Sequence, residues 1–206
     1  RAWPDATLVV GGFILGELQR DLEPAAFQRV LRSLAADAYV ITAQGEEAVL
    51  AMMEQGPESL RGGGLPSTWI PGKNGDYVLS TDVEEEGLSM NDSWVRWSRL
   101  DPADLYHTVH VRTARSCTFK CTFCSLFNVE GRLAVARPET LRLELQELSR
   151  VPGMRSIVFT DDTFNVPRPR FLDLLDVLAE FDFEWYCFFR CQFAEREIVS
   201  RMRAAG

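Results

Sequence analysis

The sequence has no long hydrophobic run, no excess of positive charge and few cysteines. No apolar stretch approaches the roughly 20 residues that a membrane-spanning helix needs, and the apolar stretch near the N-terminus is too short for a signal peptide. The formal net charge of −8 argues against a protein that binds the phosphate backbone of nucleic acids. We therefore expect a cytoplasmic protein that binds neither a membrane nor a nucleic acid.

The few cysteines are unevenly distributed. Five occur in 206 residues, and three of them, Cys117, Cys121 and Cys124, lie in the stretch CTFKCTFC. This distribution does not resemble the disulfide framework of a secreted protein. In a cytosolic protein such a cluster indicates metal binding or catalysis.

The first 55 residues alternate between strand and helix patterns. Short apolar runs at 6–12 and 37–43 predict buried strands, and helical spacing of apolar residues predicts helices at 23–36 and 45–55. This alternation predicts an α/β fold with a parallel sheet. Because two strands are too few for a doubly wound domain, we expect residues 1–60 to form only the later part of one.

Residues 61–105 are predicted to be a linker that contains a hairpin. The segment 67–81 predicts two short strands that turn at Asn74 and Gly75, a strong hairpin signal. The segment 82–105 is acidic and then rich in tryptophan, and it predicts no regular element.

The second half of the chain predicts three consecutive β–α units. The predicted strands are 106–114, 155–162 and 183–191, and the predicted helices are 137–151, 169–181 and 195–206. Each unit takes about 30 residues, the size of the βαβ steps of β/α barrels. We expect residues 106–206 to form the first half of such a barrel, and the chain to be a partial one.

The three clustered cysteines have the spacing CX3CX2C. Thiolates hold [4Fe–4S] clusters, and three from one loop leave the fourth iron open to a substrate or cofactor. One alternative is a zinc site completed by His107, His110 or Cys191, although structural zinc usually uses two separated pairs of ligands. Another alternative is that Cys191 closes the cluster as a fourth ligand and gives an electron-transfer site.

This motif, with Phe123 just before the last cysteine and with the first strand of a β/α barrel before it, resembles the signature of radical S-adenosylmethionine (SAM) enzymes. The resemblance implies that Cys117, Cys121 and Cys124 ligate a [4Fe–4S] cluster whose open iron chelates SAM. It also implies reductive cleavage of SAM to a 5′-deoxyadenosyl radical, an electron donor such as flavodoxin or ferredoxin, and a small-molecule or peptide substrate. Phe123 is a further candidate for contact with these cofactors.

The ends of the next two predicted strands carry candidates for SAM binding. Thr160, Asp161 and Asp162 occupy the place of a Gly-Gly-Glu-like motif that contacts the SAM amino group in the family. This chain departs from that motif, and the alternative is that one aspartate caps the next helix or bonds the loop. Arg190 is a candidate for the SAM carboxylate, with a surface or aspartate-paired arginine as the alternative.

The N-terminal half carries a second resemblance. VVGGF followed by DAYVITAQGEEAVLAMM is similar to the later part of the cobalamin-binding domain of B12-dependent radical SAM enzymes. The resemblance places Gly11, Gly12, Gln44, Gly45 and Glu46 in the groove for the corrinoid. A generic Rossmann-like half is the alternative.

The two resemblances together imply a C-terminal part of a Rossmann-like cobalamin-binding domain followed by the first half of a radical SAM (β/α) barrel. IVFTDDTFNVP and FFRCQ most resemble the branch with phosphinate P-methylases and peptide-tailoring enzymes. The implied reaction is methyl transfer from SAM, by way of cobalamin, to an unactivated carbon or phosphorus centre. The alternatives are a radical SAM enzyme without bound cobalamin and a non-catalytic iron–sulfur or zinc-binding module.

Overall fold

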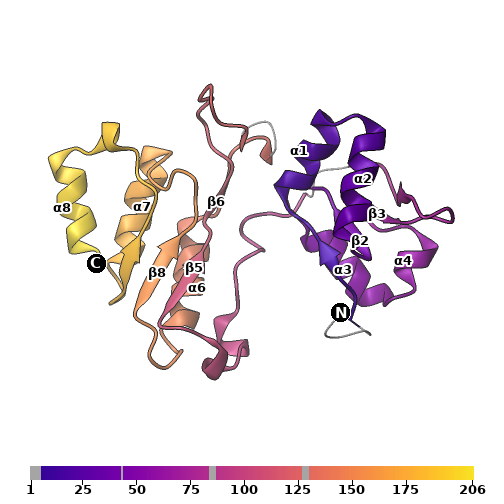
Figure 1. Ribbon diagram of the computed structural model, residues 1–206. Helices are drawn as coiled ribbons and strands as arrows, with labels where there is room; N and C mark the ends of the chain where they lie inside the picture. The colour runs from indigo at the N-terminus through magenta and orange to yellow at the C-terminus, as the bar shows by residue number, and fades with distance from the viewer. Residues whose placement is uncertain (1–5, 43, 84–86, 127–129) are drawn as a thin grey trace. The chain divides into compact units, whose positions relative to one another are not determined.

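The computed structural model describes residues 6–42, 44–83, 87–126 and 130–206. The chain divides into two compact units, Arg1–Gly87 and Leu88–Gly206, each with its own sheet and helices (Figure 1). None of the described helices combines the length and the apolar character needed to cross a membrane.

The first unit contains a four-stranded mixed sheet in the order β1-β2-β3-β4. Its strands are β1 Val9–Val10, β2 Ala38–Val40, β3 Thr68–Pro71 and β4 Tyr77–Leu79. Strands β1 and β2 pair in parallel, as the sequence predicts. The predicted hairpin also forms, and β3 pairs antiparallel with β2, so the hairpin extends this sheet.

The boundary between the two compact units falls between residues 87 and 88. The sequence instead predicts the three segments 1–60, 61–105 and 106–206. That division into a cobalamin-binding domain, a linker and a barrel stays a prediction about function.

Among the described residues, four helices accompany the first sheet, and the sequence did not predict two of them, α1 and α4. They are α1 Phe13–Asp21, α2 Pro24–Leu34, α3 Glu46–Gln55 and the short α4 Ser59–Gly62. Helix α1 was missed because a glycine, Gly16, lies in its interior, where glycine lowers helix propensity. A Cβ atom at Gly16 would lie 2.7 Å from the carbonyl oxygen of Ile41. The glycine therefore lets α1 pass against the backbone that follows β2.

Tyr39 of β2 lies at the centre of the first core. Its side chain is fully buried, and its ring makes an edge-to-face contact with Tyr77 at 4.9 Å between centroids. Its hydroxyl donates to the carbonyl oxygen of Leu31 at 2.5 Å and accepts from the Ala36 amide at 2.8 Å. Helix α2 is therefore joined to the sheet by a buried polar group whose hydrogen bonds are made, as buried polar groups require.

The second unit contains three parallel strands in the order β5-β8-β9. The strands are β5 Thr108–Val111, β8 Ser156–Phe159 and β9 Glu184–Tyr186, and the helices are α6 Pro138–Leu148, α7 Arg168–Leu178 and α8 Arg196–Ala204. The three predicted β–α units are therefore confirmed, with shorter strands than expected. That these units are the first half of a β/α barrel stays a prediction.

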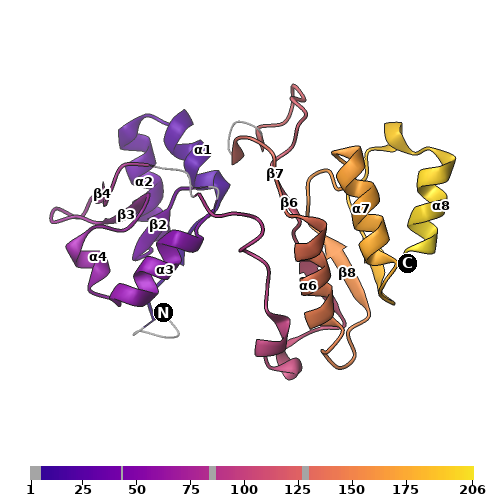
Figure 2. The same ribbon diagram turned by 180° about the vertical axis from the view of Figure 1, so that it is seen from behind.

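One face of this parallel sheet is covered by helices. Figure 2 shows α6 and α7 lying on it, and Ile157 and Phe159 of β8 pack there with Leu145 of α6 and Leu174 of α7. The other face is lined by the row His110, Val158 and Tyr186, which are register partners on the three strands. Of these three, His110 and Tyr186 are exposed.

The segment before β5, for which the sequence predicted no element, contains two short 3-10 helices, η1 Trp97–Arg99 and η2 Pro102–Asp104. The indole of Trp97 is buried and donates to Oε1 of Glu144 on α6 at 2.9 Å. Burial raises the pKa of Glu144, and the hydrogen bond from Trp97 opposes that rise. The segment is thereby anchored on α6.

Candidate functional site

The clustered cysteines lie on a loop whose two ends are joined by a small antiparallel ladder. Strand β6, Ala114–Arg115, pairs with β7, Ala134–Val135. We call residues 116–133, which this ladder closes, the cysteine loop. The sequence did not predict β7, because two residues carry no readable alternation.

Glu130 fixes the start of the cysteine loop. Both of its carboxylate oxygens accept from Nη2 of Arg112 at 3.0 Å, and Oε2 also accepts from the Ser116 amide at 2.8 Å. Ser116 has a φ of 65°, in the left-handed region, and its hydroxyl donates to the carbonyl oxygen of Gly131 at 2.7 Å. The chain therefore turns sharply just before Cys117 and is held in that turn by both ends of the loop.

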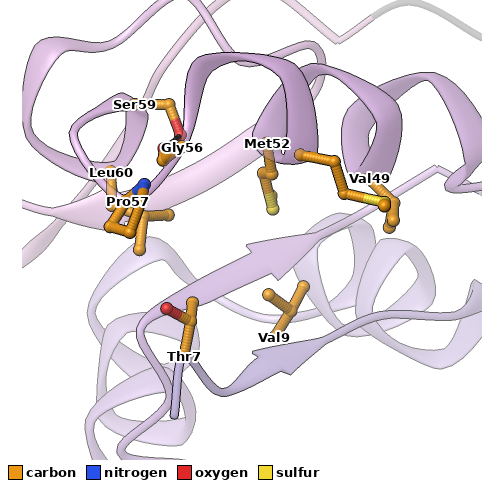
Figure 3. A pocket seen from close by; sticks show the side chains of 9 residues that line it. Thr7, Val9, Val49, Met52, Gly56, Pro57, Ser59 and Leu60 are labelled. Atoms are coloured by element: carbon orange, nitrogen blue, oxygen red, sulfur yellow. Dashed lines mark hydrogen bonds between the residues drawn. The ribbon is translucent and has the colours of Figure 1, made fainter. Parts of the chain in front are cut away.

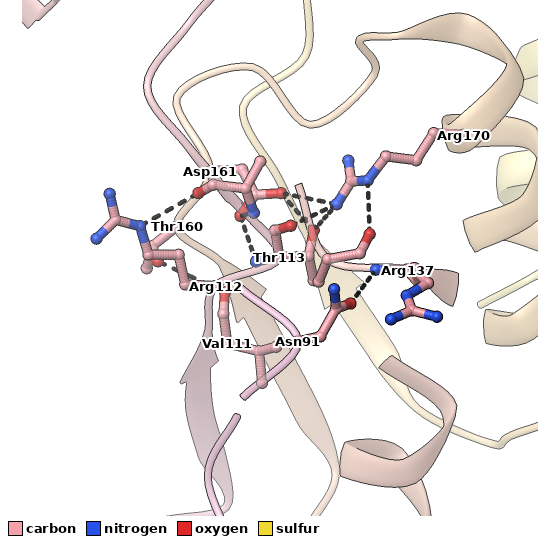
Figure 4. A network of polar contacts seen from close by, with 10 residues as sticks. Asn91, Val111, Arg112, Thr113, Arg137, Thr160, Asp161 and Arg170 are labelled. Carbon is pink, nitrogen blue, oxygen red and sulfur yellow. Dashed lines mark hydrogen bonds and ion pairs between the residues drawn. The ribbon is translucent and has the colours of Figure 1, made fainter. Parts of the chain in front are cut away.

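Asp161 joins the end of β8 to the start of β6 (Figure 4). Its side chain is fully buried and accepts from the Thr113 amide at 2.6 Å, the Thr113 hydroxyl at 2.5 Å and the Ala114 amide at 2.9 Å. Arg170 lies 3.9 Å from Asp161 and donates to the Thr113 carbonyl oxygen at 2.7 Å. Asp161 thus bonds the segment that leads into the cysteine loop, and its contact with SAM stays a prediction.

The two adjacent aspartates have different surroundings. Burial raises the pKa of Asp161, and the hydrogen bonds from Thr113 and Ala114 oppose that rise. Asp162 is exposed, yet partial desolvation and the nearby carboxylate of Glu130 raise its pKa. Thr160 is also exposed and bonds β5 through its amide, which donates to the Val111 carbonyl oxygen at 3.0 Å. Thr160 and Asp162 are therefore the accessible members of this segment.

The cysteine loop carries three free thiols in different surroundings. Cys117 and Cys121 are partly buried, and Cys124 is exposed. The Cys124 amide donates to the Cys121 carbonyl oxygen at 3.0 Å, so these two residues share one tight turn. Within the described ranges, no three histidine, cysteine, aspartate or glutamate side chains are grouped closely enough to hold a metal ion. The structure does not gather the three sulfurs, and their ligation of a cluster stays a prediction.

The chemistry of this donor set fits an iron–sulfur cluster. Three free thiols are the ligands that such clusters take, and they lie on one loop that is fixed at its base. Cys117 lies nearest to the fixed turn. Its sulfur is 3.3 Å from Oγ1 of Thr163, a residue that the sequence analysis did not single out.

Arg190 lies against the cysteine loop, although not through an acidic partner. Its guanidinium carbon is 3.7 Å from the ring centroid of Phe119. Buried Asn165 brackets the main chain of Arg190, accepting from its amide at 3.0 Å and donating to its carbonyl oxygen at 3.3 Å. This aromatic contact is not the aspartate pairing that was one alternative for Arg190, and its contact with the SAM carboxylate stays a prediction. The side chain of Phe123 is 90% exposed, so it is not part of the packed core.

No described group of three ligating side chains includes the alternative ligands. His107 Nδ1 lies 2.8 Å from the Gly153 carbonyl oxygen, and His110 lies on the exposed row of β5. Burial raises the pKa of Cys187 to about 12, with a smaller contribution from the charge of Asp161, so this thiol stays protonated. Cys191 is exposed. The metal-site alternatives that use His107, His110 or Cys191 therefore gain no support from the described residues.

The residues proposed for cobalamin lie at one edge of the first sheet. Gly11 and Gly12 separate β1 from α1, and Gln44, Gly45 and Glu46 lead from β2 into α3. Because β1 and β2 are parallel neighbours, these two connections leave the same edge of the sheet. Cβ atoms added at Gly11 and Gly45 would both contact the side chain of Val40, at 3.6 and 3.5 Å. The predicted strand 37–43 ends at Val40 in the structure, and residue 43 lies outside the described residues.

An apolar pocket of about 380 Å³ lies beside β1 (Figure 3). Val9 of β1, Met52 of α3 and Pro57 and Leu60 near α4 line it. None of the five residues predicted for cobalamin is among its lining residues. Val49, which also lines the pocket, donates through its amide to the Gly45 carbonyl oxygen at 2.9 Å, so the pocket begins one helical turn from these residues.

Comparisons in sequence give no relative, whereas comparisons of structure do. No family model and no curated protein matches the chain. Two structures of TsrM from Kitasatospora setae, described as a radical SAM methyltransferase, are similar to this chain. The match to the structure with tryptophan and a SAM analogue covers 98% of this chain, with 16% sequence identity and a TM-score of 0.67. Another, with cobalamin and a [4Fe–4S] cluster, has 14% identity and TM-score 0.65 over 98% of this chain.

OxsB, described as a cobalamin-dependent SAM radical enzyme, covers 95% of this chain at 13% identity and TM-score 0.61 in a structure with aqua-cobalamin and SAM. The chain spans 40% of the TsrM chain and 28% of the OxsB chain. At these identities the likeness shows the fold: nearly the whole chain has the mixed α/β architecture of a part of TsrM and OxsB.

Proposed function

We propose that this chain is part of a radical SAM enzyme that holds a [4Fe–4S] cluster through Cys117, Cys121 and Cys124. The observation that carries the proposal is the place of the cysteine loop. It follows the first of three parallel strands with crossover helices, in a chain with the fold of TsrM and OxsB. The structures of those two proteins include a [4Fe–4S] cluster, SAM or a SAM analogue.

The residues at the base of the loop have a positioning role in this proposal. Glu130 and Arg112 hold the turn at Ser116, the residue just before Cys117. Of the two remaining thiols, Cys121 is partly buried and Cys124 is exposed. When bound, the cluster supplies an open iron for SAM and the electron that cleaves it.

SAM is proposed to bind between the end of β8 and the end of β9. Asp162 is exposed, whereas the carboxylate oxygens of Asp161 are occupied by three donors, so Asp162 is the better partner for the SAM ammonium group. The guanidinium of Arg190 is the partner for the carboxylate, because a planar fork of donors matches a carboxylate in two-point geometry. Its contact with Phe119 keeps it beside the cysteine loop.

The finer proposal is a cobalamin-dependent methyltransferase. Gly11, Gly12, Gln44, Gly45 and Glu46 share one sheet edge, and cobalamin is present in structures of both TsrM and OxsB. We infer methyl transfer to an unactivated carbon or phosphorus centre of a small molecule or peptide, in the cytoplasm, with flavodoxin or ferredoxin as the electron donor. A radical SAM enzyme without cobalamin is the alternative.

Anaerobic reconstitution with iron and sulfide tests the proposal. We expect four irons per chain, which is one [4Fe–4S] cluster, with broad absorption in the visible region. Cys117→Ala, Cys121→Ala and Cys124→Ala should each abolish it, whereas Cys187→Ala, at a partly buried thiol outside the loop, should keep it. If zinc is retained and no iron–sulfur absorption forms, the proposal is wrong, and if Cys191→Ala abolishes the cluster as completely, the site is closed by a fourth ligand.

Cobalamin binding has a separate test. Titration of the chain with hydroxocobalamin should shift the absorption of the corrinoid and quench tryptophan fluorescence. Substitution of Gly45 by leucine should weaken this binding, because its side chain would fill the sheet edge next to Val40. Leu60→Ala, which changes the apolar pocket at a residue outside the predicted five, is the control. Equal effects of both variants would contradict the assignment of the edge.

A further inference from the structure

A side chain from outside the cysteine loop reaches the sulfur of Cys117. Thr163 follows the two aspartates after β8, and its Oγ1 lies 3.3 Å from Cys117 Sγ. The Thr163 side chain is 8% exposed, so water competes little for this contact. In the described part of the chain, neither Cys121 nor Cys124 has a comparable partner at its sulfur. The three thiols are therefore not equivalent.

The fold sets the position of Thr163 independently of the loop. Two residues before it, Asp161 is fully buried and bonded to Thr113 and Ala114. One residue after it, fully buried Phe164 stacks on Phe159 at 4.3 Å between ring centroids. Thr163 is thus held between two residues of the core, and it presents a fixed hydroxyl to the first cysteine.

The hydroxyl of Thr163 has one hydrogen and two partners. It lies 2.7 Å from the Asp162 carbonyl oxygen, to which it donates, and a protonated Cys117 can then donate to Thr163 Oγ1. A thiolate bound to iron has no hydrogen and only accepts. The contact at 3.3 Å then requires the hydroxyl hydrogen to turn from Asp162 to the sulfur. The bond that results is assisted by the charge of the thiolate.

We propose that Thr163 is a positioning residue for the cluster: it donates a hydrogen bond to Cys117 Sγ when that sulfur ligates iron, and it raises the reduction potential of the cluster. This inference rests on the proposed function. Hydrogen bonds to the sulfurs are among the factors that set cluster potentials. A donor stabilises the reduced state more, because that state carries one more negative charge.

The test compares three variants of the full chain after anaerobic reconstitution. Thr163→Val keeps the shape and removes the hydroxyl, and Thr163→Ser keeps the hydroxyl. Thr140→Val is the matched control, since it removes a threonine hydroxyl that donates to Oδ1 of Asn91 and not to a cysteine sulfur. The readout is the midpoint potential of the cluster, measured by redox titration with electron paramagnetic resonance detection.

We expect Thr163→Val to make one-electron reduction about tenfold less favourable, a shift of about 59 mV to lower potential, while Thr163→Ser and Thr140→Val keep the wild-type value. Loss of the cluster from Thr163→Val alone also supports the proposal, because the hydroxyl is then needed for ligation. Equal potentials in wild type and Thr163→Val, or equal shifts or losses in the serine or control variants, would overturn it. If wild type itself forms no cluster, the proposed function fails first.

Discussion

The base of the cysteine loop is held by hydrogen bonds to one largely buried carboxylate, whereas its tip is exposed. At the base, the Glu130 side chain is 10% exposed and accepts from Arg112 and Ser116. At the tip, Phe123 is 90% exposed and Cys124 is exposed as well. Both parts lie within the second unit. The fold therefore supplies the place of the first cysteine by itself, and leaves the other two to be positioned by what they bind.

The largest effect on stability is expected at Asp161, the buried carboxylate that bonds the segment leading into the cysteine loop. Asp161→Ala leaves the buried Arg170 guanidinium without its carboxylate partner. It also removes the acceptor of three hydrogen bonds. Breaking a buried ion pair by removal of one partner costs about 3–5 kcal/mol of unfolding free energy. Urea unfolding followed by circular dichroism measures it. The matched control is exposed Asp162→Ala, for which we expect a change within about 0.5 kcal/mol; similar losses for both variants would contradict the contrast.

A smaller effect is expected at the base itself. Glu130→Ala leaves the Ser116 amide and the Arg112 guanidinium without their carboxylate, which costs about 1–3 kcal/mol. The control at the tip, Phe123→Ala, removes an exposed ring and should change unfolding free energy by less than about 0.5 kcal/mol. Denaturant midpoints with equal slopes decide the comparison. A tip variant as destabilised as the base variant would show that the tip is also packed.

The rate of limited digestion with trypsin measures how far a bound cluster protects the exposed tip of the cysteine loop. Lys120 lies at the tip and is exposed, so cleavage after it should be slowed severalfold when three thiols bind one cluster. Arg61 in the first unit, whose side chain is 82% exposed, is the internal control and should be cut at an unchanged rate. Mass spectrometry of the fragments gives both rates in one experiment. Equal protection at both sites would indicate a general effect of the reconstitution.

The sequence predicted the local patterns of the second unit but not the long-range contacts that hold the base of the cysteine loop. The CX3CX2C spacing and the three β–α units were visible because they are local patterns, and the structure confirms the units. The partners of the loop base were not visible. Glu130 meets Arg112 across 18 residues, and Thr163 meets Cys117 across 46. Such contacts depend on how the loop folds back on the strand ends, which no short window of sequence contains.

Helix α1 and Asp161 show two further limits. The glycine in α1 lowers helix propensity, and only the close approach to Ile41 explains why it is there. At Asp161 and Asp162 the sequence shows two equal carboxylates, whereas the structure buries one and exposes the other. Burial is decided by the packing of α7 and β6 against the end of β8, so the two roles could be proposed from the sequence but not assigned to a residue.

The smallest effect concerns pH, and it tests whether the contrast between buried and exposed carboxylates extends to α6. Burial raises the pKa of Glu144, so its contribution to stability is present below the unfolded pKa of about 4.3 and is lost as pH rises through the folded pKa. The hydrogen bond from Ser98 lowers the pKa of Glu147, so the contribution of Glu147 to stability is present above its unfolded pKa and is lost as pH falls through its folded pKa.

Glu144→Gln should therefore reduce the fall in stability with rising pH, and Glu147→Gln should reduce the fall in stability on acidification. Unfolding free energies measured from pH 3 to 8 give both slopes. Slopes that change in the same direction in the two variants would show that burial does not separate these carboxylates.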